Sequence, residues 1–236
     1  MAIKNILFDL DGTLLPMDQD IFVEKYTKGL AKHMMPYGYD PRLLIKGLWM
    51  GTGAMIKNDG SRTNEEVFWE VFSSVLGRDA RADIATIEQF YLTDFQNVKN
   101  DCGFNPRSAE IIKLLKDKGY NLILATNPLF PSIATHSRVR WAGLDPDDFS
   151  FITTYENASF CKPNPDYYAE LLAKTGCKPE ESAMVGNDVD DDMVVEKLGM
   201  KSFLLTDCLI NKANADISRW PNGGFDELER WLNQLK

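Results

Sequence analysis

Apolar positions follow two different patterns along this chain. Residues 3–8, which end in the apolar run Ile6, Leu7 and Phe8, are typical of a short buried strand. From about residue 16 to residue 98 the apolar positions instead recur at the spacing of amphipathic helices. The first of these helical groups comprises Ile21, Phe22, Tyr26 and Leu30. The pattern therefore predicts a strand followed by a long helical segment.

Start and stop signals divide the helical segment. Asp40 followed by Pro41 has the character of an N-cap and a first helical turn. Thr63 with Glu66 three residues later fits a capping box, and Gly77 is placed to end that helix. The signals predict an all-helical insert of roughly four helices.

Strands and helices alternate after the insert. Strands are predicted over residues 121–125, 149–153, 182–185 and 202–205, and helices over 106–118, 132–141, 165–174, 193–198 and 225–235. This alternation predicts an α/β fold with a parallel sheet that helices cover on both faces. We expect residues 1–15 and 100–236 to form the α/β domain and residues 16–99 to form a helical cap domain.

Composition and charge narrow the class of protein. With 236 residues and 44% hydrophobic content the chain can bury a sizeable core. A net charge of −9 argues against nucleic-acid and anionic-membrane partners, but one local cation still allows a small phosphorylated substrate. No apolar run reaches the ~18 residues of a membrane span. Scattered cysteines and no leader-like segment predict a reduced, cytoplasmic protein. With only His33 and His136, a His-rich zinc site is not expected.

Polar residues follow the ends of the predicted strands. In chain order they are Asp9 and Asp11, Thr126 and Asn127, Lys162, and the acidic run 186–192 (GNDVDDD). Because ligands of parallel sheets bind at the carboxyl ends of strands, these groups are expected to meet at one edge. Side chains two residues apart on an extended segment share a face, so Asp9 and Asp11 would act on the same ligand.

Each of these features also has an ordinary structural interpretation. A DxDG segment is often a turn or part of a calcium loop, but Gly12 comes too early for that loop. The cluster from Asp188 to Asp192 lacks the calcium loop's glycine and final glutamate. A single lysine such as Lys162 is usually a solvated surface residue, and an acidic run suits a helix N-terminus. One common site explains their order better than four coincidences.

The motifs resemble those of a known family. FDLDGT at residues 8–13, ATN at 125–127, Lys162 before Pro163, and GNDVDDD at 186–192 are similar, in this order, to the four motifs of the haloacid dehalogenase (HAD) superfamily. The resemblance spans the whole chain and includes a helical insert like the family's C1 cap. It implies a Rossmann-like sheet with a mobile helical cap, and phosphoryl rather than carbon–halogen chemistry, because the dehalogenases lack an acid at the position of Asp11.

The resemblance also implies the role of each motif. Asp9 would be the nucleophile that forms an aspartyl-phosphate, and Asp11 the general acid and base. Thr126 and the N–H groups of Leu10, Asp11 and Asn127 would bind phosphate oxygens. Lys162 would neutralise the phosphate as charge redistributes. The implied activity is that of a magnesium-dependent phosphatase acting on a small phosphomonoester.

The metal ligands depend on how the fourth motif is aligned. Mg²⁺ would be held by the Asp9 carboxylate, the Asp11 carbonyl and Asp188, with Asp192 supporting the site from behind. A shift of one residue would instead align Asn187 with Asp191 and matches the distance to Gly199 better. We prefer Asp188 because asparagine is a poorer ligand for Mg²⁺.

The cap is expected to select the substrate. Lys57 and Arg62, in the glycine-rich segment 51–62, are candidates to contact a substrate carboxylate or second phosphate, although a solvated loop is an equal alternative. A phosphomutase of the β-phosphoglucomutase kind resembles the chain equally in its core motifs. A phosphonatase, with Lys57 as its nominal Schiff-base lysine, is less favoured. A non-catalytic HAD-like binding module would not need the complete set of motifs.

Overall fold

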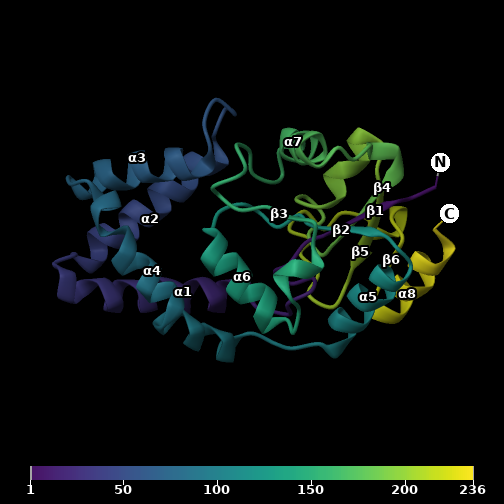
Figure 1. Cartoon of the computed structure of the whole chain (residues 1–236), viewed down its shortest axis with the longest axis horizontal. Coiled ribbons are helices and arrows are strands. Elements are labelled where there is room, and N and C mark those ends of the chain that lie inside the picture. Colours follow the sequence, from purple (N-terminus) through teal and green to yellow (C-terminus); the bar gives the residue numbers. More distant parts are fainter. Residues whose placement is uncertain (1, 236) are drawn as a thin grey trace.

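The computed structural model describes residues 2–235, and its centre is a parallel sheet of six strands in the order β3-β2-β1-β4-β5-β6 (Figure 1). The strands are β1 Asn5–Phe8, β2 Asn121–Leu124, β3 Phe151–Ile152, β4 Ser182–Gly186, β5 Lys201–Leu205 and β6 Asn222–Gly223. β1 therefore lies in the middle, paired with β2 on one side and β4 on the other. The predicted α/β fold with a parallel sheet is confirmed.

Helices cover both faces of this sheet. The α-helices are α1 Gln19–Met34, α2 Pro41–Ile56, α3 Asn64–Leu76, α4 Ile84–Leu92, α5 Pro106–Asp117, α6 Ser132–Trp141, α7 Pro165–Thr175 and α8 Phe225–Gln234. Successive side chains of a strand point to opposite faces. Ile6 and Phe8 accordingly pack in the core that contains α5 and α8, whereas Leu7 packs in the core that contains α7. This is why β1 is buried at every position.

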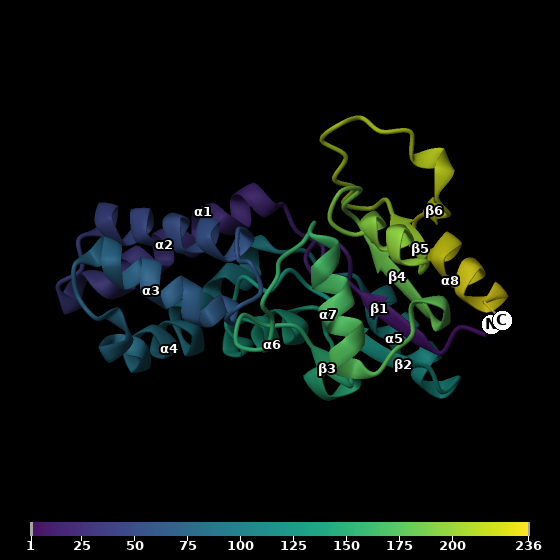
Figure 2. The same cartoon turned by 90° about the horizontal axis from the view of Figure 1, so that it is seen from above.

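The helices α1 to α4 lie together beyond one end of the sheet, as two perpendicular views show (Figures 1 and 2). Their predicted caps are present. Asp40 accepts the N–H of Leu43 at 2.8 Å, and Thr63 and Glu66 form a capping box. The chain leaves and re-enters the sheet region at neighbouring points, where the N–H of Gly103 donates to the carbonyl of Pro16 at 2.7 Å. The cap boundaries at residues 16 and 99 stay a prediction.

Several elements differ from the prediction. The segment Met193–Leu198, predicted as a helix, is a short 3₁₀ helix that ends at Gly199. Its β-branched Val194 and Val195 and its small length both disfavour an α-helix. The fourth helix of the insert, α4, ends at Leu92, and 3₁₀ turns follow over Asp94–Asp101. The two-residue strand β6 carries no periodic signal and was not predicted. Within residues 2–235 no helix combines the length and apolar character needed to cross a bilayer.

Candidate active site

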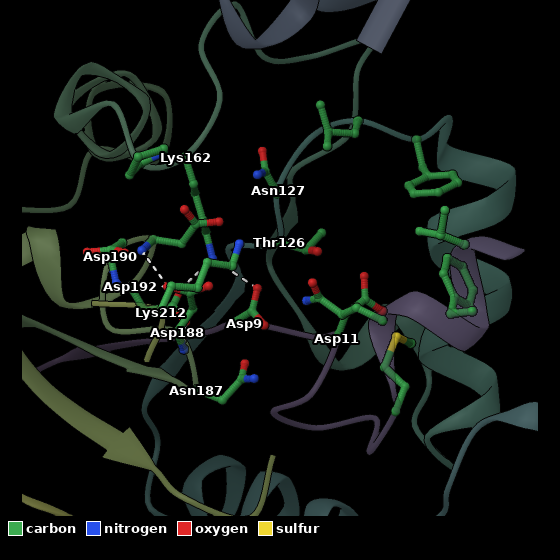
Figure 3. Close-up of a pocket in the computed structure, with 18 residues that line it drawn as sticks. Asp9, Asp11, Thr126, Asn127, Lys162, Asn187, Asp188, Asp190, Asp192 and Lys212 are labelled. Carbon is green, nitrogen blue, oxygen red and sulfur yellow. Dashed lines mark hydrogen bonds and ion pairs between the residues drawn. The ribbon is translucent and has the colours of Figure 1, made fainter. Parts of the chain in front are cut away.

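The carboxyl ends of β1, β2 and β4 meet around one cavity of about 410 Å³ (Figure 3). The N–H of Asp9 donates to the carbonyl of Val185 at 2.9 Å, and the N–H of Ala125 donates to that of Phe8 at 2.7 Å. These bonds hold the end of β1 between its two neighbours. The polar residues that line the cavity are Asp9, Asp11, Gln19, Thr126, Asn127, Lys162, Asn187, Asp188, Asp190, Asp191, Asp192 and Lys212.

Asp9 is buried at the centre of this arrangement. Its Oδ1 accepts Lys162 Nζ at 2.9 Å, and its Oδ2 accepts the hydroxyl of Thr13 at 3.3 Å. Burial raises the pKa of Asp9 to about 7; Lys162 opposes this increase, whereas the neighbouring Asp192 and Asp11 add to it. Burial is therefore the main reason that the charged form of Asp9 is disfavoured, and the two neighbouring carboxylates add to it.

Lys162 is almost completely buried and joins two carboxylates. Its Nζ donates to Asp9 at 2.9 Å and to Asp192 at 2.6 Å. Burial by itself lowers the pKa of Lys162, but the attraction of Asp192 and Asp9 outweighs it and holds the pKa well above its ordinary value. Lys162 is therefore a permanent buried cation beside Asp9, not a solvated surface lysine.

The acidic run after β4 wraps around Asp192. The N–H of Asp188 donates to Asp192 Oδ2 at 3.0 Å, and Asp188 itself accepts the N–H of Asp190 at 2.8 Å and that of Asp191 at 3.1 Å. A Cβ on Gly186 would lie 2.1 Å from Asp192 Oδ2, so only glycine allows this approach. Burial raises the pKa of Asp191 to about 6, partly offset by Lys162.

Asn187 lines the cavity and hydrogen-bonds to the first motif. Its Oδ1 accepts the hydroxyl of Thr13 at 2.9 Å, and its Nδ2 donates to the carbonyl of Cys208 at 2.7 Å. Gly12 has a φ of +87°, and a Cβ there would lie 2.4 Å from Asn187 Nδ2. The side chain of Asn187 therefore braces the turn after β1. Asp188 lines the cavity and Asp192 pairs with Lys162, and the alignment of the fourth motif stays a prediction.

Thr126 and Asn127 lie across the cavity from the first motif (Figure 3). The carbonyl of Thr126 accepts the hydroxyls of Thr153 at 2.6 Å and Tyr167 at 2.9 Å, which fixes the backbone there. Asn127 Oδ1 is buried and has no hydrogen-bond partner among the described residues. Leu10, whose N–H was predicted to bind phosphate, is completely buried and does not line the cavity.

Asp11 is held by a residue that sequence reasoning missed. Its Oδ2 forms an ion pair with Nη1 of Arg138, whose side chain is 1% exposed. Arg138 lies four residues after Ala134 and three before Trp141, both buried positions on the same face of α6. The sequence signal for a buried Arg138 is its helical spacing from the apolar residues Ala134 and Trp141.

Lys57 and Arg62, predicted to contact the substrate, lie away from the cavity, whereas Lys212, which was not predicted, lines it. Neither Lys57 nor Arg62 lines it, because Lys57 is exposed at the end of α2 and Arg62 forms an ion pair with Glu70 on the outer surface. Lys212, in the loop between β5 and β6, reaches the cavity beside Asp188 (Figure 3). Loop residues carry no periodic pattern, so the sequence offered no signal for Lys212.

The carboxylates here suit a hard cation with few protein ligands. Within residues 2–235 no three His, Cys, Asp or Glu side chains gather closely enough to form a metal cluster. The predicted set has only two carboxylate side chains, Asp9 and Asp188, and one carbonyl. That composition fits Mg²⁺, which usually binds one or two carboxylates and keeps several waters.

The chain is similar to known proteins both in sequence and in fold. A family model described as haloacid dehalogenase-like hydrolase matches residues 3–196. The chain is 26% identical over 209 residues to a phosphoglycolate phosphatase from Aliivibrio fischeri, covering 86% of this chain and 84% of the relative. It is 29% identical over 200 residues to a glyceraldehyde 3-phosphate phosphatase from Methanocaldococcus jannaschii, covering 84% and 82%. The crystal structure of a HAD phosphatase from Thermococcus onnurineus superposes with a TM-score of 0.61 at 19% identity and covers 98% of each chain.

Proposed function

Since the chain belongs to the haloacid dehalogenase-like hydrolases, we propose that it is a phosphatase that hydrolyses a small phosphomonoester through an aspartyl-phosphate on Asp9. One observation carries the proposal. Asp9 is a buried carboxylate at the cavity, with the Lys162 cation at 2.9 Å and a second carboxylate, Asp11, two residues away. A nucleophile, a cation and a proton carrier are thus available to one phosphoryl group.

The reaction has two steps. In the first, an Asp9 oxygen attacks phosphorus, the bond to the leaving oxygen breaks, and Asp11 gives its proton to that oxygen. In the second, Asp11 takes a proton from water, the resulting hydroxide attacks phosphorus, and the bond to Asp9 breaks to release phosphate. Lys162 stays paired with Asp9 and Asp192 and offsets the charge that moves onto the Asp9 side.

Mg²⁺ is the cofactor that these residues would hold. The ion would be bound by the Asp9 carboxylate, the Asp188 carboxylate and the backbone carbonyl of Asp11. Asp192 would support Asp188 by accepting the backbone N–H of Asp188. Bound Mg²⁺ supplies positive charge that offsets the phosphate and the neighbouring carboxylates. The position of Asp9 near Asp11, Asp188 and Asp192 in one cavity supports this assignment, because a bound cation would offset the repulsion among these carboxylates.

The cavity favours a small substrate. Its volume of about 410 Å³ is at the lower end of ligand sites, and Phe22, Val23 and Phe130 add apolar surface to its lining. Lys212 supplies a cation at this acidic rim, where it would meet the incoming phosphate. Two relatives are named for phosphoglycolate and glyceraldehyde 3-phosphate, which are small phosphomonoesters.

The test is release of inorganic phosphate from a panel of small phosphomonoesters in magnesium buffer. We expect turnover by the parent protein and a loss of about 10⁴-fold or more in Asp9→Asn, because the nucleophile is removed. Asp147→Asn, at an exposed aspartate far along the chain, is the matched control and should leave turnover unchanged. Undiminished phosphate release by Asp9→Asn would overturn the proposal. Transfer of phosphate between sugar positions without release would favour a phosphomutase.

A further inference from the structure

Arg138 is a buried charged residue that has no role in the reaction proposed above. Its side chain is 1% exposed, and arginine is almost never so buried unless it is paired. Its partner is Asp11, 127 residues away in the chain, and the guanidinium also donates from Nη2 to the hydroxyl of Thr135 at 3.3 Å. Removing a charge from water is costly, and the attraction within an ion pair offsets this cost only when its geometry is good.

The pair leaves the two oxygens of Asp11 in different situations. Oδ2 is occupied by Arg138 Nη1, whereas Oδ1 is buried and has no hydrogen-bond partner among residues 2–235. Asp11 lines the cavity, and Arg138 does not. Arg138 thus anchors one oxygen of Asp11, and the other oxygen is buried without a partner.

Aromatic rings hold the guanidinium itself. The Arg138 Cζ lies 4.4 Å from the centroid of the Phe130 ring and 5.8 Å from that of Phe22. Phe130 follows the Thr126–Asn127 segment, and Phe22 belongs to α1 in the helical insert. The two rings are 6.0 Å apart, edge to face. Arg138 therefore touches both the sheet-edge loop and the insert.

Resting on the proposed function, we infer that Arg138 is a positioning residue for Asp11. By holding Oδ2 it fixes the orientation in which the Asp11 carboxyl group gives its proton to the leaving oxygen and later takes one from water. Through Phe22 the same guanidinium ties this orientation to the place of α1. Arg138 does not line the cavity, so its loss acts on proton transfer and leaves substrate binding largely unchanged.

The test compares two leaving groups. An alkyl phosphomonoester needs a proton on its leaving oxygen, whereas 4-nitrophenyl phosphate releases a stable anion without one. We expect Arg138→Gln to lower kcat/KM for the alkyl ester by about 10²-fold, and for 4-nitrophenyl phosphate by less than about 10-fold. Arg138→Lys, which keeps the charge, should recover part of the difference, and Arg140→Gln, at an exposed arginine on the same helix, should change neither. An equal loss on both esters would overturn the inference.

A second measurement covers the case in which Arg138→Gln does not fold. Arg138→Lys then gives the same leaving-group comparison with the buried charge retained. If Arg138 acts through Asp11, Arg138→Lys should add less than about twofold in an Asp11→Asn background, because the two residues act as a unit. A full additional loss in that background would contradict the inference. The two proposals can fail separately. If Asp9→Asn loses all turnover but the Arg138 variants lower kcat/KM equally for both esters, the proposed function stands and only this inference is overturned.

Discussion

The two carboxylates after β1 are two residues apart and have very different surroundings. Asp9 is held by Lys162 and Thr13, which belong to the sheet-bearing part of the chain. Asp11 is held by Arg138, which stacks near Phe22 of the helical insert. The comparison separates the proposed chemistry into a nucleophile that depends on the sheet alone and an acid/base that also depends on where α1 lies.

The largest effect is expected on the Asp9 side. Lys162→Met should lower kcat by about 10³-fold, because the buried cation beside the nucleophile is lost. It should also lower the free energy of unfolding by about 3 kcal/mol, since Asp9 and Asp192 are left without their common partner. Steady-state kinetics and urea unfolding measure the two quantities. Lys197→Met, at an exposed lysine, is the control; a Lys162→Met protein with parental kcat would contradict the prediction.

The next effect tests the alignment of the fourth motif. Mg²⁺ should raise the thermal midpoint of the parent protein, because a ligand that binds only the folded state stabilises it. Asp188→Ala should abolish this shift and lower kcat/KM by at least about 10²-fold. Asp191→Ala should retain most of the shift. The opposite result, with Asp191→Ala losing the response to Mg²⁺ and Asp188→Ala keeping it, would show that Asn187 and Asp191 are the aligned pair.

A smaller effect is expected on the Asp11 side from the helical insert. Phe22→Leu keeps an apolar side chain of similar size and removes the ring near Arg138, a contact worth about 1 kcal/mol. We expect kcat/KM for an alkyl phosphomonoester to fall about fivefold and that for 4-nitrophenyl phosphate to change by less than twofold. Parallel assays of both esters measure the difference. Equal changes for both would mean that α1 has no influence on Asp11.

The smallest effect is expected for Lys212, which is not among the residues that hold Asp9 or Asp11. Lys212 is exposed at the rim of the cavity, where solvent and salt screen its charge. Lys212→Met should raise KM for a small phosphomonoester about threefold and leave kcat within twofold. Repeating the assay at higher ionic strength should shrink the difference between variant and parent. A difference that persists unchanged in high salt would argue for a direct contact rather than screened attraction.

Much of the fold followed from local patterns. The apolar run of β1, the Thr63–Glu66 capping box and the helical spacing in α1 all appear in the structure, because each depends on residues a few positions apart. The 3₁₀ helix at Met193–Leu198 and the short strand β6 were not predicted. Both depend on what surrounds them more than on their own composition.

The candidate site was predictable where its residues belong to motifs. Asp9, Thr126, Lys162 and Asp188 all line one cavity, as expected of groups that follow the strands of a parallel sheet. Lys57 and Arg62 were chosen only for charge and a glycine-rich segment, and the structure does not bring them to the cavity. A charge on a loop carries no information about the direction in which the loop folds.

The sequence by itself determined the order of the strands and helices, the motifs at the strand ends, and the family to which the chain belongs. These features are local, since periodicity, caps and short motifs act within a few residues. Only the tertiary structure decided that Arg138 pairs with Asp11, that Phe22 lies near the guanidinium, and that Lys212 reaches the cavity. Such contacts join segments far apart in the chain, and they depend on how whole elements pack, which no local pattern encodes.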